Sequence, residues 1–184
     1  MALNEFISTV KKNNIARQNK FRVSIMGPLG AMTEPMTMFA EAVSMPGQTL
    51  VSSPDELRYG PLREVATGMS YGPTNVTFIC TTGLPEKIFF EDWQVMCVSK
   101  DSWEARYYSD YIGQMQIWSL DPVTEEDVYG VELREVFPKT ISGQEFGSAS
   151  NDSYQTIDVE LAFRTWHTIP TGGTVEVILP GYIP

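Results

Sequence analysis

The sequence predicts a mainly β protein with one substantial helix. Residues 154–166, which read YQTIDVELAFRTW, alternate apolar and charged side chains with a period of two. Such alternation is typical of an antiparallel strand with one buried and one exposed face. Further β-rich runs occur at residues 21–25, 36–43, 74–81 and 114–120, separated by turns that contain glycine or proline. Together these observations favour antiparallel sheet over a helical fold.

The strand at residues 154–166 needs a neighbour, and residues 131–137 are the best candidate. A Gly/Ser/Asn-rich connection at residues 142–153 joins the two. Alternation in residues 128–137 holds until Glu135, where it slips by one position. A β-bulge inserts one extra residue into a strand and produces such a slip, so we expect a bulge at residues 135–137.

Residues 86–99 form the best predicted helix, with Phe89, Trp93, Met96 and Cys97 spaced along one face. Pro85 suits its first turn. This aromatic stripe is expected to pack against a sheet, so we predict a core that contains Phe89, Trp93, Met96, Val159, Leu161 and Phe163. Asp101 and Glu104 have the spacing of a capping box, which predicts a short helical turn.

Composition limits the classes of function. The 184 residues are expected to form a single domain, residues 1–184, and the formal net charge of −10 argues against an outer surface that wraps DNA. Cys80 and Cys97 are distant in sequence, and free thiols are favoured over a disulfide or metal site. The single histidine, His167, and the absence of a catalytic motif predict no enzymatic activity, no metal and no cofactor. Free thiols suit a reducing cytoplasm. No apolar run is long enough for a membrane span, and no export signal is apparent.

Residues 1–15 contain a short amphipathic helix, with apolar side chains at positions 3, 6, 7 and 10. It docks either on its own core or on a neighbouring subunit. Residues 11–22 contain no acidic residue and five basic ones: Lys11, Lys12, Arg17, Lys20 and Arg22. They form either a solvated face or a patch that meets an acidic partner.

Residues 48–72 are predicted to form an extended hairpin arm with few large apolar side chains. A two-stranded hairpin is not stable by itself in water, so the arm either lies on its own domain or adds to another chain. We expect the second, with contacts to a neighbouring subunit from Leu50, Val51, Leu57, Tyr59, Leu62 and Arg63. Residues 168–184 form a C-terminal extension with one more apolar run.

Taken together, five segments resemble the tail tube protein of contractile-tailed bacteriophages of the T-even type. These are the opening residues 16–25, the Met-Pro-Gly turn that ends residues 39–47, the arm residues 59–65, the helix residues 90–94, and residues 136–138 with the closing strand 157–166. The resemblance covers most of residues 1–167 and extends to the tubes of injection systems.

This resemblance implies a fold of two packed antiparallel sheets, a small barrel-like β-sandwich with a flanking helix. It also implies homo-hexameric rings that stack into a tube inside a contractile sheath in the virion tail, assembled in the host bacterial cytoplasm. Tail sheath protein, baseplate, tail terminator and tape-measure protein would be the partners. DNA would pass through the lumen without sequence-specific binding, and an acidic wall would repel it.

Other functions stay open. The chain resembles the tube of a secretion or extracellular contractile injection system almost as well, or a tube-like baseplate or terminator component. A more distant alternative is a ligand-binding β-sandwich that uses Trp103, Tyr107, Tyr108 and Tyr111 as an aromatic platform.

The distribution of charge suggests how rings would stack. Lys11, Lys12, Arg17, Lys20 and Arg22 lie within twelve positions, whereas residues 91–135 are strongly acidic. We expect the basic segment of one ring to meet acidic loops of the next, with tube elongation slowing above about 0.15 M salt as screening grows.

Overall fold

The computed structural model describes residues 3, 5, 7, 8, 15–55, 60–148 and 154–170. Among residues 1–15, positions 3, 5, 7 and 8 are helical, and the rest of the predicted N-terminal helix lies outside the described residues, as do residues 171–184 of the extension. The elements are β1 (Phe21–Gly27), β2 (Gly30–Ala31), α2 (Glu34–Met38), β3 (Ala40–Val43), β4 (Gln48–Pro54), β5 (Glu64–Tyr71), β6 (Thr74–Ile79), α3 (Pro85–Cys97), α4 (Tyr108–Tyr111), β7 (Gly113–Leu120), β8 (Asp127–Ile141), β9 (Thr156–Ala162) and β10 (Thr165–Ile169).

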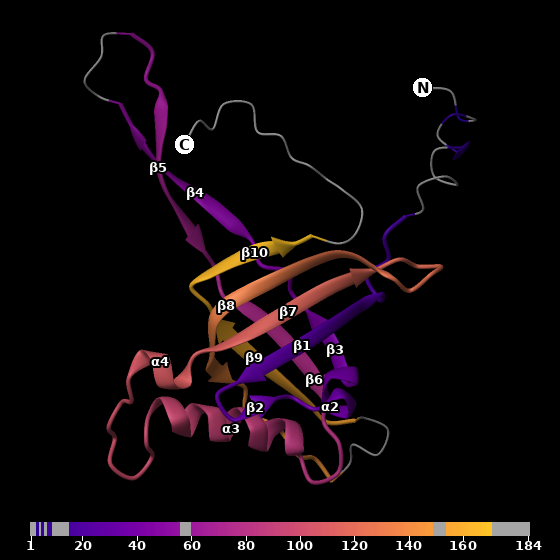
Figure 1. Cartoon of the computed structure of the whole chain (residues 1–184), viewed down its shortest axis with the longest axis vertical. Coiled ribbons are helices and arrows are strands. Elements are labelled where there is room, and N and C mark those ends of the chain that lie inside the picture. Colours follow the sequence, from indigo (N-terminus) through magenta and orange to yellow (C-terminus); the bar gives the residue numbers. More distant parts are fainter. Residues whose placement is uncertain are drawn as a thin grey trace.

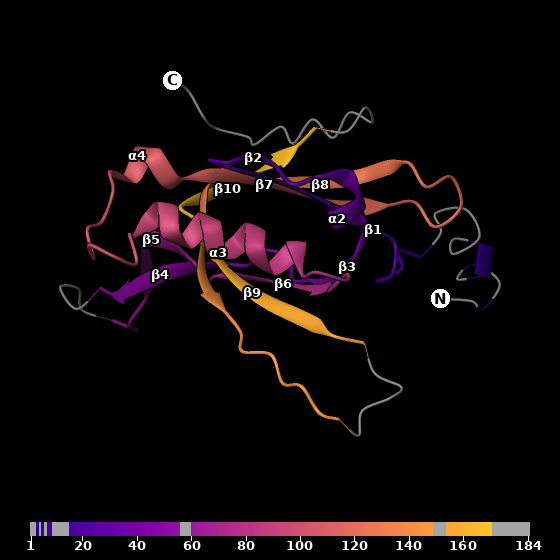
Figure 2. The same cartoon turned by 90° about the horizontal axis from the view of Figure 1, so that it is seen from below.

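Two antiparallel layers form the body of the molecule (Figures 1 and 2). The strand order is β2-β1-β7-β8-β9-β6-β3, and β10 also pairs with β8. We call the layer of β2, β1, β7, β8 and β10 sheet A, and the layer of β8, β9, β6 and β3 sheet B. The prediction of a mainly β fold with two packed antiparallel sheets is confirmed. Within the described residues the strand path stays open, ending at β2 and β3.

The long strand β8 belongs to both layers. Residues 127–136 pair with β7, and residues 137–141 pair with β9. Between them Val136 faces Gly113 and Arg134 faces Gln114, so Glu135 is the extra residue and has φ of 56°. This confirms the bulge that the slip in alternation predicted. The bulge bends the strand and passes the chain from one sheet to the other.

The segment 154–166 was predicted as one strand, and this is wrong. β9 ends at Ala162, and β10 begins at Thr165 in the other layer. Both strands pair with β8: Phe137 faces Ala162, and Leu133 faces Trp166. The core-facing residues are odd-numbered up to Phe163 and then include Trp166, so the alternation shifts by one position at this break.

The core lies between the two sheets, and α3 closes one end of it (Figure 2). Sheet A contributes apolar side chains of β1, β7 and β8, and sheet B contributes those of β6 and β9. Trp93, Val159 and Leu161 are fully buried, Phe89 and Phe163 are partly buried against this core, and Met96 is half-buried. The fully buried phenylalanine of the helix is Phe90, which stacks edge-on against Phe89.

Gly113 lies where β7 passes closest to the helix. A Cβ at this position would lie 2.3 Å from the Met26 carbonyl oxygen and 2.7 Å from the Trp93 ring. We therefore expect Gly113→Ala to lower the free energy of unfolding by about 1–3 kcal/mol, as overpacking a close-packed core does. Urea unfolding measures this. Gly143→Ala is the control, because its Cβ would meet nothing within 4 Å and its φ is ordinary; an equal loss in both variants would contradict the steric explanation.

Two local predictions are wrong. Residues 36–43 form α2 followed by the short strand β3, with Pro35 in the first turn of the helix, instead of one strand. Residues 101–104 form no helical turn: Val98 bridges to Ala105, and the chain between them makes a tight loop.

None of the helices in the described part of the chain is long and apolar enough to cross a membrane.

Candidate assembly surfaces

The arm of β4 and β5 projects away from the sandwich (Figure 1). Its strands pair with each other, from Gln48 opposite Tyr71 to Pro54 opposite Glu64. Every residue of β4 and all but the last residue of β5 are exposed. Within residues 48–54 and 65–71 there is no charged side chain. Soluble proteins normally protect exposed strand edges with charges, prolines or a covering element, and this ribbon lacks that protection over most of its length.

The predicted interface residues are divided between the two faces of the arm. Leu50 pairs with Met69 on one face, and Val51 pairs with Gly68 on the other. A bulge follows, and the hydroxyl of Thr67 donates to the Val51 carbonyl at 3.0 Å. Leu62 is exposed, Arg63 pairs with Asp55 at 3.2 Å, and Leu57 and Tyr59 lie outside the described residues. Both faces therefore offer apolar surface.

The base of the arm is anchored on the body. Tyr71 stacks against Phe163 with ring centroids 6.1 Å apart, and Phe163 packs on the main core. The arm is thus rooted on the core, and the rest of its length is exposed among the residues that the structure describes.

The basic residues predicted to stack rings have a different environment. Lys20 forms an ion pair with Glu125, and Arg22 pairs with Asp127 at 2.6 Å and lies over the Trp118 ring at 5.9 Å. Arg17 is exposed, and Lys11 and Lys12 lie outside the described residues. Two of the five candidate cations thus meet their acidic partners in the same chain. The acidic turn at residues 125–127 therefore forms ion pairs with Lys20 and Arg22 of its own chain.

The Lys20–Glu125 pair has a measurable consequence. Its hydrogen bond, and then its charge, lowers the pKa of Glu125 below the ordinary value of 4.5. We expect Lys20→Glu to lower Tm, because it places two carboxylates together, and the double variant Lys20→Glu/Glu125→Lys to restore Tm. Thermal unfolding of the two variants tests this. A double variant no more stable than the single one would show that Lys20 acts outside its own chain.

The loop after α3 displays aromatic side chains. Ser99 and Trp103 donate backbone N–H groups to the carbonyls of Glu104 and Ser99 at 3.1 and 3.0 Å, which holds the loop in a defined shape. Trp103 is 82% exposed and Tyr107 is 83% exposed. Trp103 has φ of 60°, which favours glycine or asparagine and costs a bulky residue about 1–2 kcal/mol. We call residues 98–107 the aromatic loop.

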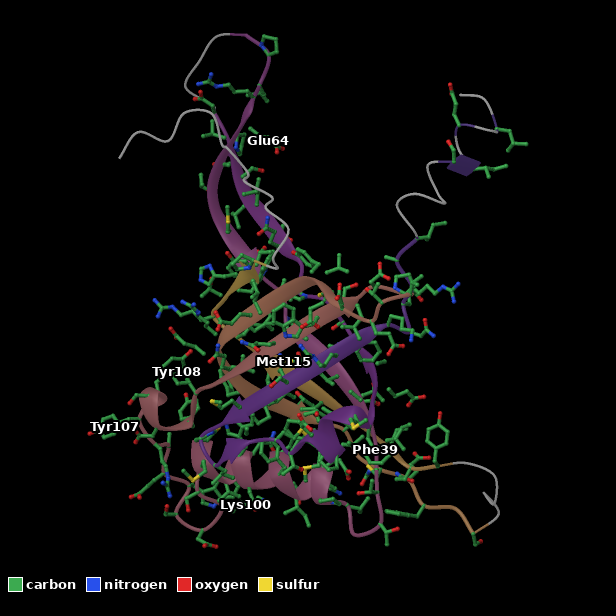
Figure 3. All side chains as sticks on the ribbon, turned by 45° about the vertical axis from the view of Figure 1, so that its right-hand side comes forward. Phe39, Glu64, Lys100, Tyr107, Tyr108 and Met115 are labelled. Atoms are coloured by element: carbon green, nitrogen blue, oxygen red, sulfur yellow. The ribbon has the colours of Figure 1, made fainter. Side chains whose placement is uncertain are left out.

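The four aromatic residues of the predicted platform are not equivalent. Tyr111 packs edge-on between Tyr108 and Phe137, with ring centroids 5.5 and 5.6 Å apart. Tyr108, the first residue of α4, is 44% exposed, whereas Tyr107 just ahead of the helix is 83% exposed; Figure 3 labels both residues. Tyr111 is therefore part of the packing that holds α4, and it does not share one open platform with Trp103.

A groove of about 600 Å³ lies beside the open edge of β1. One wall is β1 with the end of β7, and the other is α2 with the start of β3. The lining is mixed: apolar side chains such as Phe21, Met32 and Trp118 alternate with the polar or charged Arg22, Ser24, Glu34, Thr37 and Gln116. Within the described residues β2 pairs with Met26 and Gly27 of the β1 edge, and the Met32 N–H donates to the Ile25 carbonyl at 2.8 Å, so the edge is open from Phe21 to Ser24. The sequence did not reveal this groove, because its walls come from distant segments. We call it the β1–α2 groove.

The family of the chain follows from its sequence as a whole. A family model described as phage tail tube protein matches residues 12–169. The chain belongs to this family. The tail tube protein has no match among curated protein sequences at a significant level.

Solved structures share the fold of this tail tube protein. A chain of the six-fold symmetrised anti-feeding prophage baseplate has 12% identity and a TM-score of 0.63, with 85% of this chain and 97% of that chain covered. A chain of the anti-feeding prophage cap has 10% identity, a TM-score of 0.61 and coverages of 88% and 99%. A chain of the sheath–tube complex of an extracellular contractile injection system has 14% identity, a TM-score of 0.56 and coverages of 89% and 97%. At these identities the likeness shows a common fold.

Proposed function

We propose that this tail tube protein is a structural subunit that assembles into hexameric rings, which stack to form the inner tube of a virion tail. The observation that supports this best is the arm, a 7- and 8-residue ribbon with no charge over most of its length, whose two edges are open within the described residues. Such a ribbon requires pairing or burial that the described part of its own chain does not supply. A neighbouring subunit supplies it.

The edges of sheet A support the same proposal. Within the described residues β10 pairs only with β8, and β1 is open at residues 21–24. These two strands lie at opposite margins of the sheet (Figure 1). Joining the β10 edge of one subunit to the β1 edge of the next would remove both exposed edges. Repetition of such a heterologous contact closes a ring when the rotation per subunit permits.

Charge suits a conduit for DNA. Six chains carry 6 × −10 = −60 formal charges per ring. If this charge lines the lumen, the wall repels phosphates and DNA slides past without sequence-specific contacts. A tail sheath protein, baseplate, tail terminator and tape-measure protein would be the partners of such a tube, formed in the host bacterial cytoplasm. We propose no enzymatic activity for it.

The alternative is a tube of an extracellular contractile injection system, with protein cargo in place of DNA. This alternative is supported by the similarity of the fold to the anti-feeding prophage and injection-system chains. The sequence match to the phage family favours the tail. The two differ in cargo, so the contents of tubes isolated from the natural assembly distinguish them.

Electron microscopy of the full-length chain across a concentration series tests the assembly. We expect six-fold rings that stack into tubes, with sedimentation showing a matching increase in mass. The same material should not retain duplex DNA on a filter at about 0.15 M salt, because a wall with high negative charge repels it. A chain that remains monomeric at every concentration would contradict the proposal, and strong DNA retention would contradict the acidic lumen.

A further inference from the structure

The outer edge of β10 is unpaired within the described residues. The strand lies at the margin of sheet A, where it pairs with β8 on one side and with no other described strand (Figure 1). Thr168 is on the core side of β10, opposite the buried Val131, and yet it is exposed. Proteins normally protect a free strand edge of this kind. This end of sheet A therefore lacks a neighbouring strand among the residues that the structure describes.

The sequence that follows β10 has the pattern of one more strand. Residues 170–173 read PTGG and residues 174–179 read TVEVIL, with Pro180 and Gly181 next. Most of residues 174–179 are β-branched, and glycine or proline bounds them on both sides, which is typical of a strand that follows a turn. Residues 171–184 lie outside the described part of the structure, so this strand is a prediction from sequence. We call residues 174–179 the C-terminal run.

The connection to β10 is too short to take the C-terminal run to a distant edge. Residues 170–173 span at most about 14 Å when fully extended. Loops of about two to five residues commonly join the strands of a hairpin. Since β8 already occupies one side of β10, the free edge of β10 itself is the partner within reach.

A hairpin with this loop has a register that matches the two faces of β10. It places Thr174 opposite Ile169 and therefore Val177 opposite Trp166, the residue of β10 that packs on the core. A slip by one residue would instead place Glu176 opposite Trp166, and burying a charged side chain there is costly. The pattern of the C-terminal run thus favours the register that the loop length gives.

The same register suits the other positions of the strand. Val175 falls opposite the exposed Thr168 and extends the apolar surface on the core side. Glu176 falls opposite His167 on the exposed face, where a carboxylate can accept a hydrogen bond from the imidazole. Cross-strand pairs of this kind stabilise an antiparallel sheet.

We propose that the C-terminal run pairs with the outer edge of β10 in the free subunit and thereby keeps this edge from joining another copy. The inference rests on the proposed function, which assigns the same edge to β1 of a neighbouring subunit. The two contacts exclude each other, because one strand edge accepts one partner strand. The C-terminal run therefore limits the spontaneous assembly of free subunits and is displaced when a subunit enters a ring.

The chain's own C-terminal run is favoured over a foreign strand by its tether. A short tether gives it a millimolar effective concentration at the edge. A second copy in dilute solution cannot match this. Within a growing ring the arm and other contacts hold the neighbouring β1 in place, so the same argument then favours the neighbour.

An engineered disulfide tests the pairing. In a chain with Cys80→Ser and Cys97→Ser, the pair Thr168→Cys and Val175→Cys should form an intrachain disulfide under mild oxidation, because directly opposite residues have Cα atoms about 4.5–5.5 Å apart. Thr168→Cys with Glu176→Cys is the matched control, because these two side chains would point to opposite faces. Equal oxidation of both pairs, or disulfides formed only between chains, would overturn the proposal.

A chain that ends at Pro170 tests the effect on assembly. We expect it to fold, because the core described above comes from residues 21–166. Its β10 amides should exchange hydrogen faster than those of the full-length monomer. Rings should form at a concentration at least about tenfold lower, because the tethered competitor is gone. Hydrogen exchange with mass spectrometry measures the first effect, and sedimentation measures the second.

Two single substitutions repeat this test in the full-length chain. Val177→Asp places a carboxylate on the core side of the hairpin and should lower the concentration for assembly as the shortened chain does. Ile178→Asp makes the same kind of change one position away, on the exposed face, and should assemble as the wild type does. Equal behaviour of these two variants would overturn the proposed register.

The outcomes separate this inference from the proposed function. If the full-length and shortened chains form tubes at the same concentration, the limit on assembly is wrong and the tube stands. If neither chain assembles at any concentration, the proposed tube is wrong; the intrachain disulfide would then still support the pairing, and its absence would overturn it.

Discussion

A chain in which residues 50–69 are replaced by the two-residue turn Asn-Gly is expected to fold as a stable monomer and to form no tubes. Thr49 and Ser70 are directly opposite in the arm, so a two-residue turn joins them in the register they already have. Gln48 and Tyr71 stay in place, and so does the stacking of Tyr71 on Phe163. The deletion thus removes the ribbon and retains its root.

Folding should survive because the removed residues are exposed and none belongs to the core. Shortening a loop also lowers the entropy cost of closing it. Assembly should fail because the proposed intersubunit pairing loses its main element. Sedimentation and electron microscopy measure assembly, and circular dichroism with thermal unfolding measures the fold.

A milder variant controls for the size of the deletion. Leu50→Ser with Met69→Ser changes one cross-strand pair on one face and keeps the ribbon. We expect weaker assembly than in the wild type and an unchanged monomer. Normal tubes from the deleted chain would show that the arm is not an assembly element, and an unfolded deleted chain would show that the arm stabilises its own domain.

The strands of this tail tube protein were largely predictable, because alternation is a local property of the sequence. Even the bulge at Glu135 appeared as a slip in the pattern. The break at residues 163–164 leaves a similar slip, because Phe163 and Trp166 both pack on the core although they are three positions apart, but the prediction ran one strand through it. The strand predicted at residues 36–43 was wrong in its first half, where Pro35 begins a helical turn.

The hairpin of the arm was also predictable, because its turn residues and its small number of large apolar residues are visible in the sequence. The β1–α2 groove was not, because it joins residues from β1, α2 and β7 that only the topology brings together. The ion pairs at the start of β1 could not be predicted from the sequence either, because Lys20 and Glu125 are 105 positions apart. An excess of basic residues in one segment indicated a partner, and the fold supplied that partner within the chain for Lys20 and Arg22.

Trp93 packs α3 against strands β1 and β7 of sheet A, and its loss should have the largest effect on stability of any single substitution proposed for this chain. The side chain is fully buried, and its ring lies against Gly27 and Gly113. Its indole N–H donates to the Tyr111 carbonyl at 2.7 Å, which fixes the end of α4. One residue therefore fills the end of the core and satisfies a backbone oxygen.

Trp93→Ala is expected to lower the free energy of unfolding by about 3–5 kcal/mol, the range for truncation of a large buried aromatic side chain. Trp93→Phe keeps most of the ring but leaves the Tyr111 carbonyl without its indole donor, so we expect a smaller loss of about 1–3 kcal/mol. Urea unfolding of the monomeric arm-deleted chain measures both without interference from assembly.

The matched control for this series is Trp103→Ala, which removes the same side chain from an exposed position. Its effect on the monomer should stay within about 0.5 kcal/mol, as is usual for surface substitutions. The contrast between the two tryptophans separates burial from residue type, because both variants lose an indole and only one opens the core. A loss below about 1 kcal/mol in Trp93→Ala would mean that the helix face does not pack on the sheets, since truncating a buried tryptophan costs several times more.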